Sequence, residues 1–142
     1  MTQRIVPFIG YEDAAGAIEW LERAFGFVEN RDARHEEGGM IGHAELNLDE
    51  ATVYLSTPDG YASPKRLRET SELARRAYDN PWVIDGQFVE VDDVDAHHAR
   101  ALSAGATILR APEDPGVGYR VYTAEDPEGH RWMFGEALRS DA

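Results

Sequence analysis

His43 and Glu45 are the pair whose residue types and spacing most directly suggest chemistry in this sequence. They stand two positions apart in an alternating stretch, residues 40–48, so on a β-strand both side chains point to the same face. An imidazole beside a carboxylate can hydrogen-bond a ligand or exchange a proton with it. As a metal pair the two are incomplete, because a catalytic metal site needs about three such ligands. A solvated polar strand face without function remains the third interpretation.

Glu90 and Arg131 form a second polar pair, in the other half of the chain. Strand alternation predicts that both lie on one face, where a salt bridge is the simplest interpretation. Alternatively, Glu90 stays free to meet a cationic group or to transfer a proton. The remaining histidines carry weaker signals: His97 and His98 are predicted on the surface or in helix packing, His130 in a turn, and His35 near a hairpin end.

Aromatic and thioether side chains are predicted on the same strand faces as these polar pairs. Such a lining suits a flat apolar ligand. The residues predicted to line this surface are Phe8, Tyr54, Phe88 and Met133, with Trp82 either at its rim or as a plug in the core. Trp132 and Phe134 alternate to the other side and are predicted to be core.

The elements that must position these residues follow a pattern that occurs twice. Asp13 can cap a helix over residues 14–25 that ends at Gly26, and the acidic run 92–95 precedes a second helix that ends at Gly105. An internal repeat of this kind indicates two copies of one module. The predicted strands cover residues 4–11, 27–36, 40–48 and 51–56 in the first copy and 87–92, 107–110, 119–123 and 130–134 in the second. A charged, partly helical connector is predicted between the copies.

Length and charge limit the possible functions. The chain has 142 residues and no cysteine, and its 27 acidic and 14 basic residues give a net charge of −13. We expect a single domain over residues 1–142, with modules at 1–60 and 84–138 and a connector at 61–83. The negative charge disfavours nucleic acid as a partner, although it would attract a cationic ligand. No segment is long and apolar enough to suggest a membrane span or a signal peptide, so a cytoplasmic protein is expected.

Three stretches resemble the vicinal oxygen chelate superfamily, which includes glyoxalase I, extradiol dioxygenases, fosfomycin-resistance enzymes and bleomycin-binding resistance proteins. They are residues 7–27, which begin PFIGYEDAA, residues 89–96 (VEVDDVDA), and the closing run 126–135 (DPEGHRWMFG). The resemblance implies an α+β fold of paired βαβββ modules, with eight curved, mainly antiparallel strands forming a cup. It also implies a homodimer, since members of the superfamily commonly pair.

Catalytic members of this superfamily hold a divalent metal with side chains from the first and last strands of each module. The matching positions here are Val6, Ser56, Gly86 and Met133, or Leu55 and Asp85 if the alignment slips by one. The four preferred residues cannot supply the imidazole and carboxylate ligands that such a metal needs. We therefore expect no metal cofactor, and we assign no catalytic residue.

The sequence thus predicts a small-molecule binding protein that encloses an aromatic or cationic ligand in a metal-free cleft, as the antibiotic-binding members do. The alternative is a lyase, isomerase or dioxygenase with displaced metal ligands or a carboxylate base. A third possibility is a cup largely filled by its own side chains.

Overall fold

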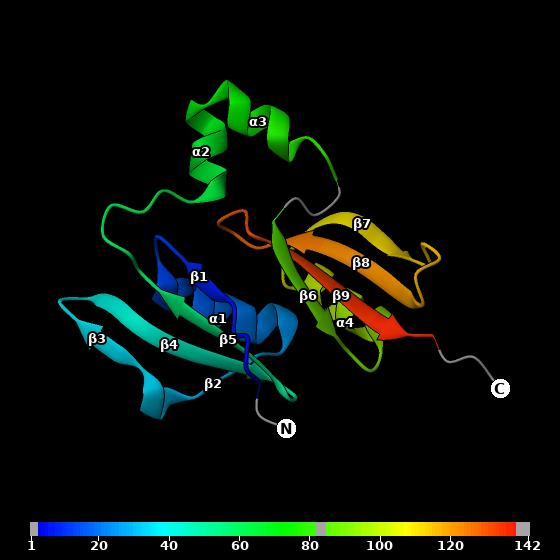
Figure 1. Cartoon of the computed structure of the whole chain (residues 1–142), viewed down its shortest axis with the longest axis horizontal. Helices are drawn as coiled ribbons and strands as arrows, with labels where there is room; N and C mark the ends of the chain where they lie inside the picture. The colour runs from blue at the N-terminus through cyan, green and yellow to red at the C-terminus, as the bar shows by residue number, and fades with distance from the viewer. Residues whose placement is uncertain (1–2, 82–84, 139–142) are drawn as a thin grey trace.

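Two β-sheets lie side by side, each backed by one helix (Figure 1). The computed structural model describes residues 3–81 and 85–138, so the predicted site residue Trp82 lies outside the described residues. The sheets have five and four strands and are not closed into a barrel. This architecture confirms the predicted α+β fold of two related modules. No helix among the described residues is both long and apolar enough to cross a membrane.

The first module carries a sheet in the order β1-β5-β4-β2, with β3 also paired to β4. β1 runs parallel to β5, and the other pairs are antiparallel. Its elements are β1 (Phe8–Gly10), α1 (Ala14–Phe25), β2 (Val28–Glu29), the short 3₁₀ helix η1 (Arg31–Ala33), β3 (His35–Glu37), β4 (Met40–Leu48) and β5 (Ala51–Ser56).

Two predicted strands of this module are shorter in the structure. The strand predicted over residues 27–36 is interrupted by η1, so the chain has nine strand segments among its described residues and not eight. The strand predicted over residues 4–11 shrinks to β1. Pro7 directly precedes β1 and has no N–H group to donate to a neighbouring strand. Its carbonyl accepts from the Tyr54 N–H at 2.8 Å.

The second module repeats the arrangement with the order β6-β9-β8-β7, and β6 runs parallel to β9. The predicted connector folds into two short helices that project beyond the sheets (Figure 1). The elements are α2 (Pro64–Thr70), α3 (Glu72–Tyr78), β6 (Gly86–Glu90), α4 (Val94–Ser103), β7 (Thr107–Glu113), β8 (Tyr119–Glu125) and β9 (Arg131–Ala137).

The predicted helix boundaries are confirmed by their capping contacts. The Asp13 carboxylate accepts from the Gly16 N–H at 3.0 Å, and the Asp93 carboxylate accepts from the Ala96 N–H at 3.1 Å. Gly26 ends α1 with a φ of 84°, a left-handed conformation that favours glycine. Both long helices therefore begin as the sequence predicted. Helix α1 ends at the predicted glycine, and α4 ends at Ser103, two residues before Gly105, whose φ is 91°.

One hydrophobic core joins the two modules. The helices α1 and α4 pack against each other and against the inner faces of both sheets, and Trp132 and Phe134 are fully buried there, as predicted. His97 of α4 belongs to this packing: its Nε2–H donates to the Phe25 carbonyl at 2.7 Å, and its Nδ1 accepts from the Tyr122 hydroxyl at 2.6 Å. Because the helices cover the inner faces, the outer faces of both sheets remain available to a ligand.

Candidate functional site

The outer face of the first sheet brings four of the predicted site residues together. Phe8 of β1 is the register partner of Tyr54 in β5, and Tyr54 is the partner of Glu45 in β4. The His43 ring lies 4.8 Å from the Tyr54 ring and 6.0 Å from the Phe8 ring, between centroids. Phe8 is 57% exposed. These side chains form a partly open aromatic surface, which we call the first aromatic face.

His43 and Glu45 interact directly on this face. The His43 Nε2 and the Glu45 Oε2 are 2.9 Å apart, with 29% and 26% of the two side chains exposed. The alternation of β4 accounts for their position, since Ala44 and Leu46 between and beyond them are buried against the helix layer. An imidazole held by a carboxylate can bind a polar ligand group or exchange a proton with it.

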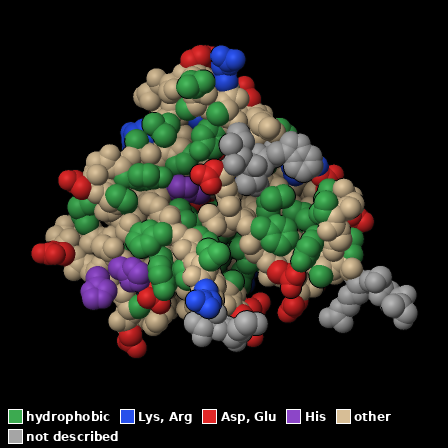
Figure 2. Space-filling model, viewed as in Figure 1, with side chains coloured by type: hydrophobic (Ala, Val, Ile, Leu, Met, Phe, Trp, Pro, Cys, Tyr) green, Lys and Arg blue, Asp and Glu red, His purple; other side chains and the backbone are tan. Residues whose placement is uncertain are grey.

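A second aromatic face lies on the outer side of the other sheet. Phe88 of β6 pairs in register with Met133 of β9, and its ring packs edge-on against Tyr119 at 5.1 Å. The sequence interpretation did not include Tyr119, although the alternation of β8 places it opposite the buried Tyr122. In the space-filling view, hydrophobic side chains gather over both sheets (Figure 2).

Gly135 makes room for the Phe88 ring. A Cβ atom at position 135 would lie 2.6 Å from the Phe88 Cζ and 3.4 Å from the Tyr119 Cδ1, and the first distance is shorter than any ordinary contact. The closing motif of the sequence contains this glycine, but nothing in the motif indicated that its role is to seat an aromatic ring of another strand.

The predicted pairing of Glu90 with Arg131 is wrong. In the parallel register of β6 and β9, Arg131 lies beside Gly86, whereas Glu90 lies beside Gly135. The Arg131 Nε instead donates to the Glu125 carboxylate at 2.9 Å, and the Arg131 side chain is only 1% exposed. Arg131 is therefore a buried structural residue and not part of an open ligand surface.

Arg131 helps to anchor the connector helices. It donates to the backbone carbonyls of Tyr78 and Asn80, and Arg68 of α2 contacts the same Glu125 at 3.1 Å. Both guanidinium groups lie 5.1 Å from the centre of the Tyr78 ring, within the range of cation–π attraction. These contacts attach the end of α3 to the second module.

Glu90 borders two acidic clefts, one between the modules and one within the second module. A cleft of about 670 Å³ lies between Glu90 and Asp92 on one side and the turn from Leu48 to Ala51 on the other. A neighbouring cleft of about 360 Å³ shares Glu90 and Asp92 and adds Glu136. The surroundings of Glu90 are therefore negatively charged, which favours a cationic group over an anionic one.

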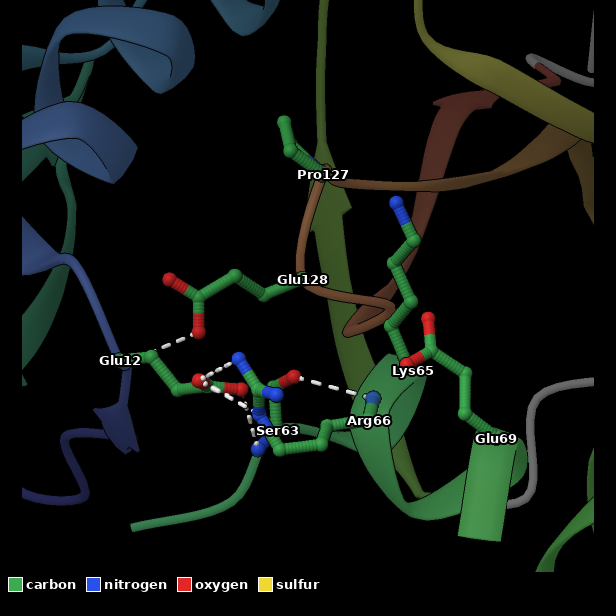
Figure 3. A pocket seen from close by; sticks show the side chains of 7 residues that line it. All are labelled: Glu12, Ser63, Lys65, Arg66, Glu69, Pro127 and Glu128. Carbon is green, nitrogen blue, oxygen red and sulfur yellow. Dashed lines mark hydrogen bonds and ion pairs between the residues drawn. The ribbon is translucent and has the colours of Figure 1, made fainter. Parts of the chain in front are cut away.

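The pocket in Figure 3 is a junction between the modules whose polar groups largely satisfy one another. The Glu12 carboxylate accepts from the Arg66 Nε at 2.8 Å and from the Ser63 N–H at 3.0 Å, while Lys65 and Glu69 extend away from it. The hydrogen bonds from Arg66 and Ser63 lower the pKa of Glu12 from 4.5 to about 2. The pocket has a volume of about 270 Å³, and Pro127 and Glu128 of the second module also line it.

A buried hydrogen-bond network lies behind this junction. The Asp126 Oδ2 accepts from the Tyr11 hydroxyl at 2.7 Å and from the Trp132 Nε1–H at 3.1 Å. Burial, followed by the charge of Asp126, raises the pKa of Tyr11 well above 10, and burial also raises the pKa of Asp126. His130 donates from Nε2 to the Gly10 carbonyl at 2.7 Å, so this predicted turn residue also links the two modules. The network joins the closing turn of the chain to its first strand.

The residues at the positions that bind metal in catalytic members of this fold do not suit a metal. Val6 and Gly86 have no side-chain donor, Ser56 is buried at 8% exposure, and Met133 offers only a soft thioether. Within residues 3–81 and 85–138, no three histidine, aspartate or glutamate side chains are grouped so that they could hold a metal ion. At the four preferred positions there is thus no imidazole or carboxylate ligand, and the alternative position Asp85 would add a single carboxylate.

Known proteins share both the sequence and the fold. The family described as the Glyoxalase/Bleomycin resistance protein/Dioxygenase superfamily matches residues 4–134. "Uncharacterized protein Mb0911c" of Mycobacterium bovis is 35% identical over 133 residues, which cover 94% of this chain and 82% of that protein. "Uncharacterized protein Rv0887c" of Mycobacterium tuberculosis is 35% identical over 94% of this chain and 74% of its own length.

Solved structures agree with this assignment. TioX from Micromonospora sp. ML1 superposes with a TM-score of 0.68 and 28% identity, covering 99% of this chain and 100% of TioX. TnmS3, described as an antibiotic binding protein from Streptomyces sp. CB03234, superposes with a TM-score of 0.61 and 19% identity, covering 96% of this chain and 98% of TnmS3. At that identity TnmS3 supports the fold alone. With its paired modules, its two aromatic faces and a family match over nearly its whole length, the chain belongs to the Glyoxalase/Bleomycin resistance protein/Dioxygenase superfamily.

Proposed function

We propose that this protein binds a flat organic small molecule against its aromatic faces and needs no metal ion to do so. The observation that carries the proposal is the first aromatic face, where Phe8, His43 and Tyr54 expose ring surface around one polar pair. Aromatic rings that are partly open to solvent attract planar ligands through buried area and ring–ring contact.

The similar proteins support an antibiotic-like ligand. TnmS3 has the same fold and is described as an antibiotic binding protein. The family that matches this chain also includes bleomycin resistance proteins by its own description. An extended aromatic natural product is therefore the ligand class that we favour, and a positive charge on it would suit the net charge of −13.

A homodimer is part of the proposal. Phe8 and Phe88 are 57% and 48% exposed, so neither aromatic face is enclosed by the chain's own described residues. Large exposed aromatic surface is unfavourable in water, and a second copy placed over these faces would close a cup around the ligand. Sedimentation at micromolar concentration tests this part: a species of twice 15.8 kDa is expected, and a clean monomer would exclude a composite cup.

An enzyme without the usual metal site is the second candidate. It is favoured by the hydrogen bond between His43 and Glu45, because a carboxylate-supported imidazole can act as a base in a lyase or isomerase reaction. Turnover of a bound compound, abolished by Glu45→Gln with little change in affinity, would favour this candidate over simple binding.

Equilibrium titration with planar aromatic compounds, followed by calorimetry, tests the proposed binding. Phe8→Ala and Phe88→Ala should each weaken binding by about 1–3 kcal/mol, the scale of one aromatic contact and its buried area. Leu73→Ala is the control, because Leu73 is 75% exposed on α3, outside both aromatic faces. If both phenylalanine variants bind as tightly as the control variant, the ligand does not lie on these faces.

A further inference from the structure

We infer that His43 and Glu45 act together as a proton acceptor for the hydroxyl group of an aromatic ligand, so that the preferred ligand is a phenol or a similarly acidic hydroxyarene. This inference rests on the proposed binding function and specifies its ligand chemistry. It depends on three observations: the hydrogen bond between the two side chains, the rings around them, and the charge of the chain.

The hydrogen bond decides which nitrogen of His43 can accept. An ionised carboxylate can only accept hydrogen bonds, so the contact at 2.9 Å between the Glu45 Oε2 and the His43 Nε2 places the hydrogen on Nε2. In the neutral imidazole, Nδ1 then carries the lone pair and is the acceptor. With 29% of its side chain exposed, His43 can reach a ligand at the surface while Glu45 holds its ring.

The rings around His43 form a wall suited to an aromatic ligand. Tyr54 lies 4.8 Å from the His43 ring, and Phe8 lies 6.0 Å away on the next strand. Among residues 3–81 and 85–138, the Tyr54 hydroxyl has no hydrogen-bond partner, so it too can bond to a ligand oxygen. The titratable groups that face His43 are Glu45 on β4, Tyr54 on β5 and His35 on β3, whose ring is 6.4 Å away; Phe8 on β1 carries no charge.

Charge explains why a proton acceptor helps this protein to bind such a ligand. A chain of net charge −13 repels a free phenolate. If a neutral phenol binds, its O–H bond breaks, the electron pair stays on oxygen, and a new N–H bond forms at the His43 Nδ1. The resulting imidazolium lies between the phenolate oxygen and the Glu45 carboxylate and donates a hydrogen bond to each, so the transfer adds no net charge to the site. This is how a carboxylate supports a protonated imidazole in general acid–base sites.

The experiment uses the full chain and two probes that differ in one group. 4-Nitrophenol has an acidic hydroxyl, and its phenolate absorbs at longer wavelength than the phenol, whereas 4-nitroanisole has the same ring with a methyl ether. Both are titrated with protein at a pH at which free 4-nitrophenol is mostly protonated. Binding to the wild type should raise the ratio of phenolate to phenol by about tenfold or more, which corresponds to one pKa unit of preferential stabilisation.

Variants separate the proton acceptor from the aromatic wall. His43→Phe keeps a ring but has no acceptor, so it should abolish the spectral shift while 4-nitroanisole still binds. Glu45→Gln should reduce the shift, because the imidazolium loses its counter-charge. His98→Phe is the matched control: His98 lies on α4, on the helix side of the second sheet, and the shift should persist.

Each other outcome counts against a defined part of the argument. If both probes bind but 4-nitrophenol shows no shift, or if His43→Phe retains the shift, the proton acceptor is excluded and the binding proposal survives. If His35→Phe loses the spectral shift and His43→Phe keeps it, the proton acceptor is His35 and not His43, and the inference is overturned. If neither probe binds, the inference and the proposed aromatic binding surface both fail.

Discussion

The carboxylate of Glu128 accepts hydrogen bonds from the backbone N–H groups of Glu12 and Asp13, at 2.6 and 2.9 Å. Glu128 belongs to the turn between the last two strands, and the two N–H groups precede the first helix. The closing turn of the second module thus holds the start of the helix of the first module, more than a hundred residues away in the sequence. Together with the bonds from Tyr11 to Asp126 and from His130 to Gly10, this contact joins the two modules that carry the aromatic faces.

Replacing Glu128 with Gln should destabilise the protein by about 1–2 kcal/mol, because the amide nitrogen of Gln cannot accept one of the two hydrogen bonds. Urea unfolding measures the effect. Glu69→Gln is the control, since Glu69 lines the same pocket but extends away from the Glu12–Arg66 pair. Equal stability of the two variants would show that the Glu128 hydrogen bonds contribute nothing to the free energy of unfolding.

Gly135→Ala should weaken ligand binding through Phe88. The new methyl group would lie 2.6 Å from the end of the Phe88 ring, so the ring must rotate away from its contact with Tyr119. We expect a loss of about 1 kcal/mol or more in affinity for a planar aromatic ligand, the scale of one aromatic contact. Gly42→Ala is the matched control, because a Cβ at position 42 meets only the His35 carbonyl, at 3.9 Å. Unchanged affinity in Gly135→Ala would show that the Phe88 ring does not contact the ligand.

Stability should fall below neutral pH because of His97. Burial lowers the pKa of His97 from its usual 6.5, with a smaller lowering contribution from the charge of Arg100 and an opposing one from the hydrogen bond to Phe25. Below pH 6.5 the unfolded chain therefore binds a proton at this position that the folded chain resists. The stabilising contribution is complete above pH 6.5 and is lost as the pH falls through the lower, folded-state value.

Urea unfolding of the wild type and of His97→Gln between pH 5 and pH 8 checks this expectation. The stability difference between the two proteins should shrink as the pH falls, because only the wild type must resist protonation of this buried ring. His98→Gln should leave the pH dependence of the wild type intact. A wild-type advantage that is constant across this range would contradict the prediction.

Breaking the buried contact of Arg131 with Glu125 should be costly. Their side chains are 1% and 8% exposed, and removing Arg131 leaves the buried Glu125 carboxylate with Arg68 as its remaining cationic partner. Arg131→Met is expected to lose about 3 kcal/mol or more of unfolding free energy. The control is Arg75→Met, which removes an ion pair between Arg75 and Glu72. Because these two side chains are 49% and 72% exposed, the loss in unfolding free energy should be less than about 1 kcal/mol. Similar losses of unfolding free energy in both variants would mean that burial of an ion pair does not determine how much its removal destabilises the protein.

Purified protein should contain no stoichiometric divalent metal, because the positions that bind metal in catalytic relatives hold Val6, Ser56, Gly86 and Met133. Elemental analysis and calorimetry with Ni²⁺, Mn²⁺, Fe²⁺ and Zn²⁺ provide the measurement. Micromolar or tighter binding that disappears in His43→Ala or Glu45→Ala would instead indicate a metalloenzyme with displaced ligands.

Local patterns in the sequence determined the modules and the two faces of each strand. The caps at Asp13 and Gly26 predicted the first helix because they satisfy groups within one turn of it. Alternation along residues 40–48 separated His43 and Glu45 from the buried Ala44 and Leu46, because side chains of a strand point to opposite faces in turn. These features depend on neighbours in the chain, so the chain itself reveals them.

Only the tertiary structure decided which residues of different strands meet. Alternation predicted that Glu90 and Arg131 share a face, which the register of β6 with β9 bears out. The same register sets Arg131 beside Gly86 and leaves Glu90 at an acidic cleft, so the two residues do not pair. The space that Gly135 leaves for Phe88 and the bonds from Glu12 and Asp13 to Glu128 likewise join segments far apart in sequence. The physical reason is that the alternation of side chains along a strand determines which face a side chain occupies. Strand register and module packing determine which residues of other segments lie beside it.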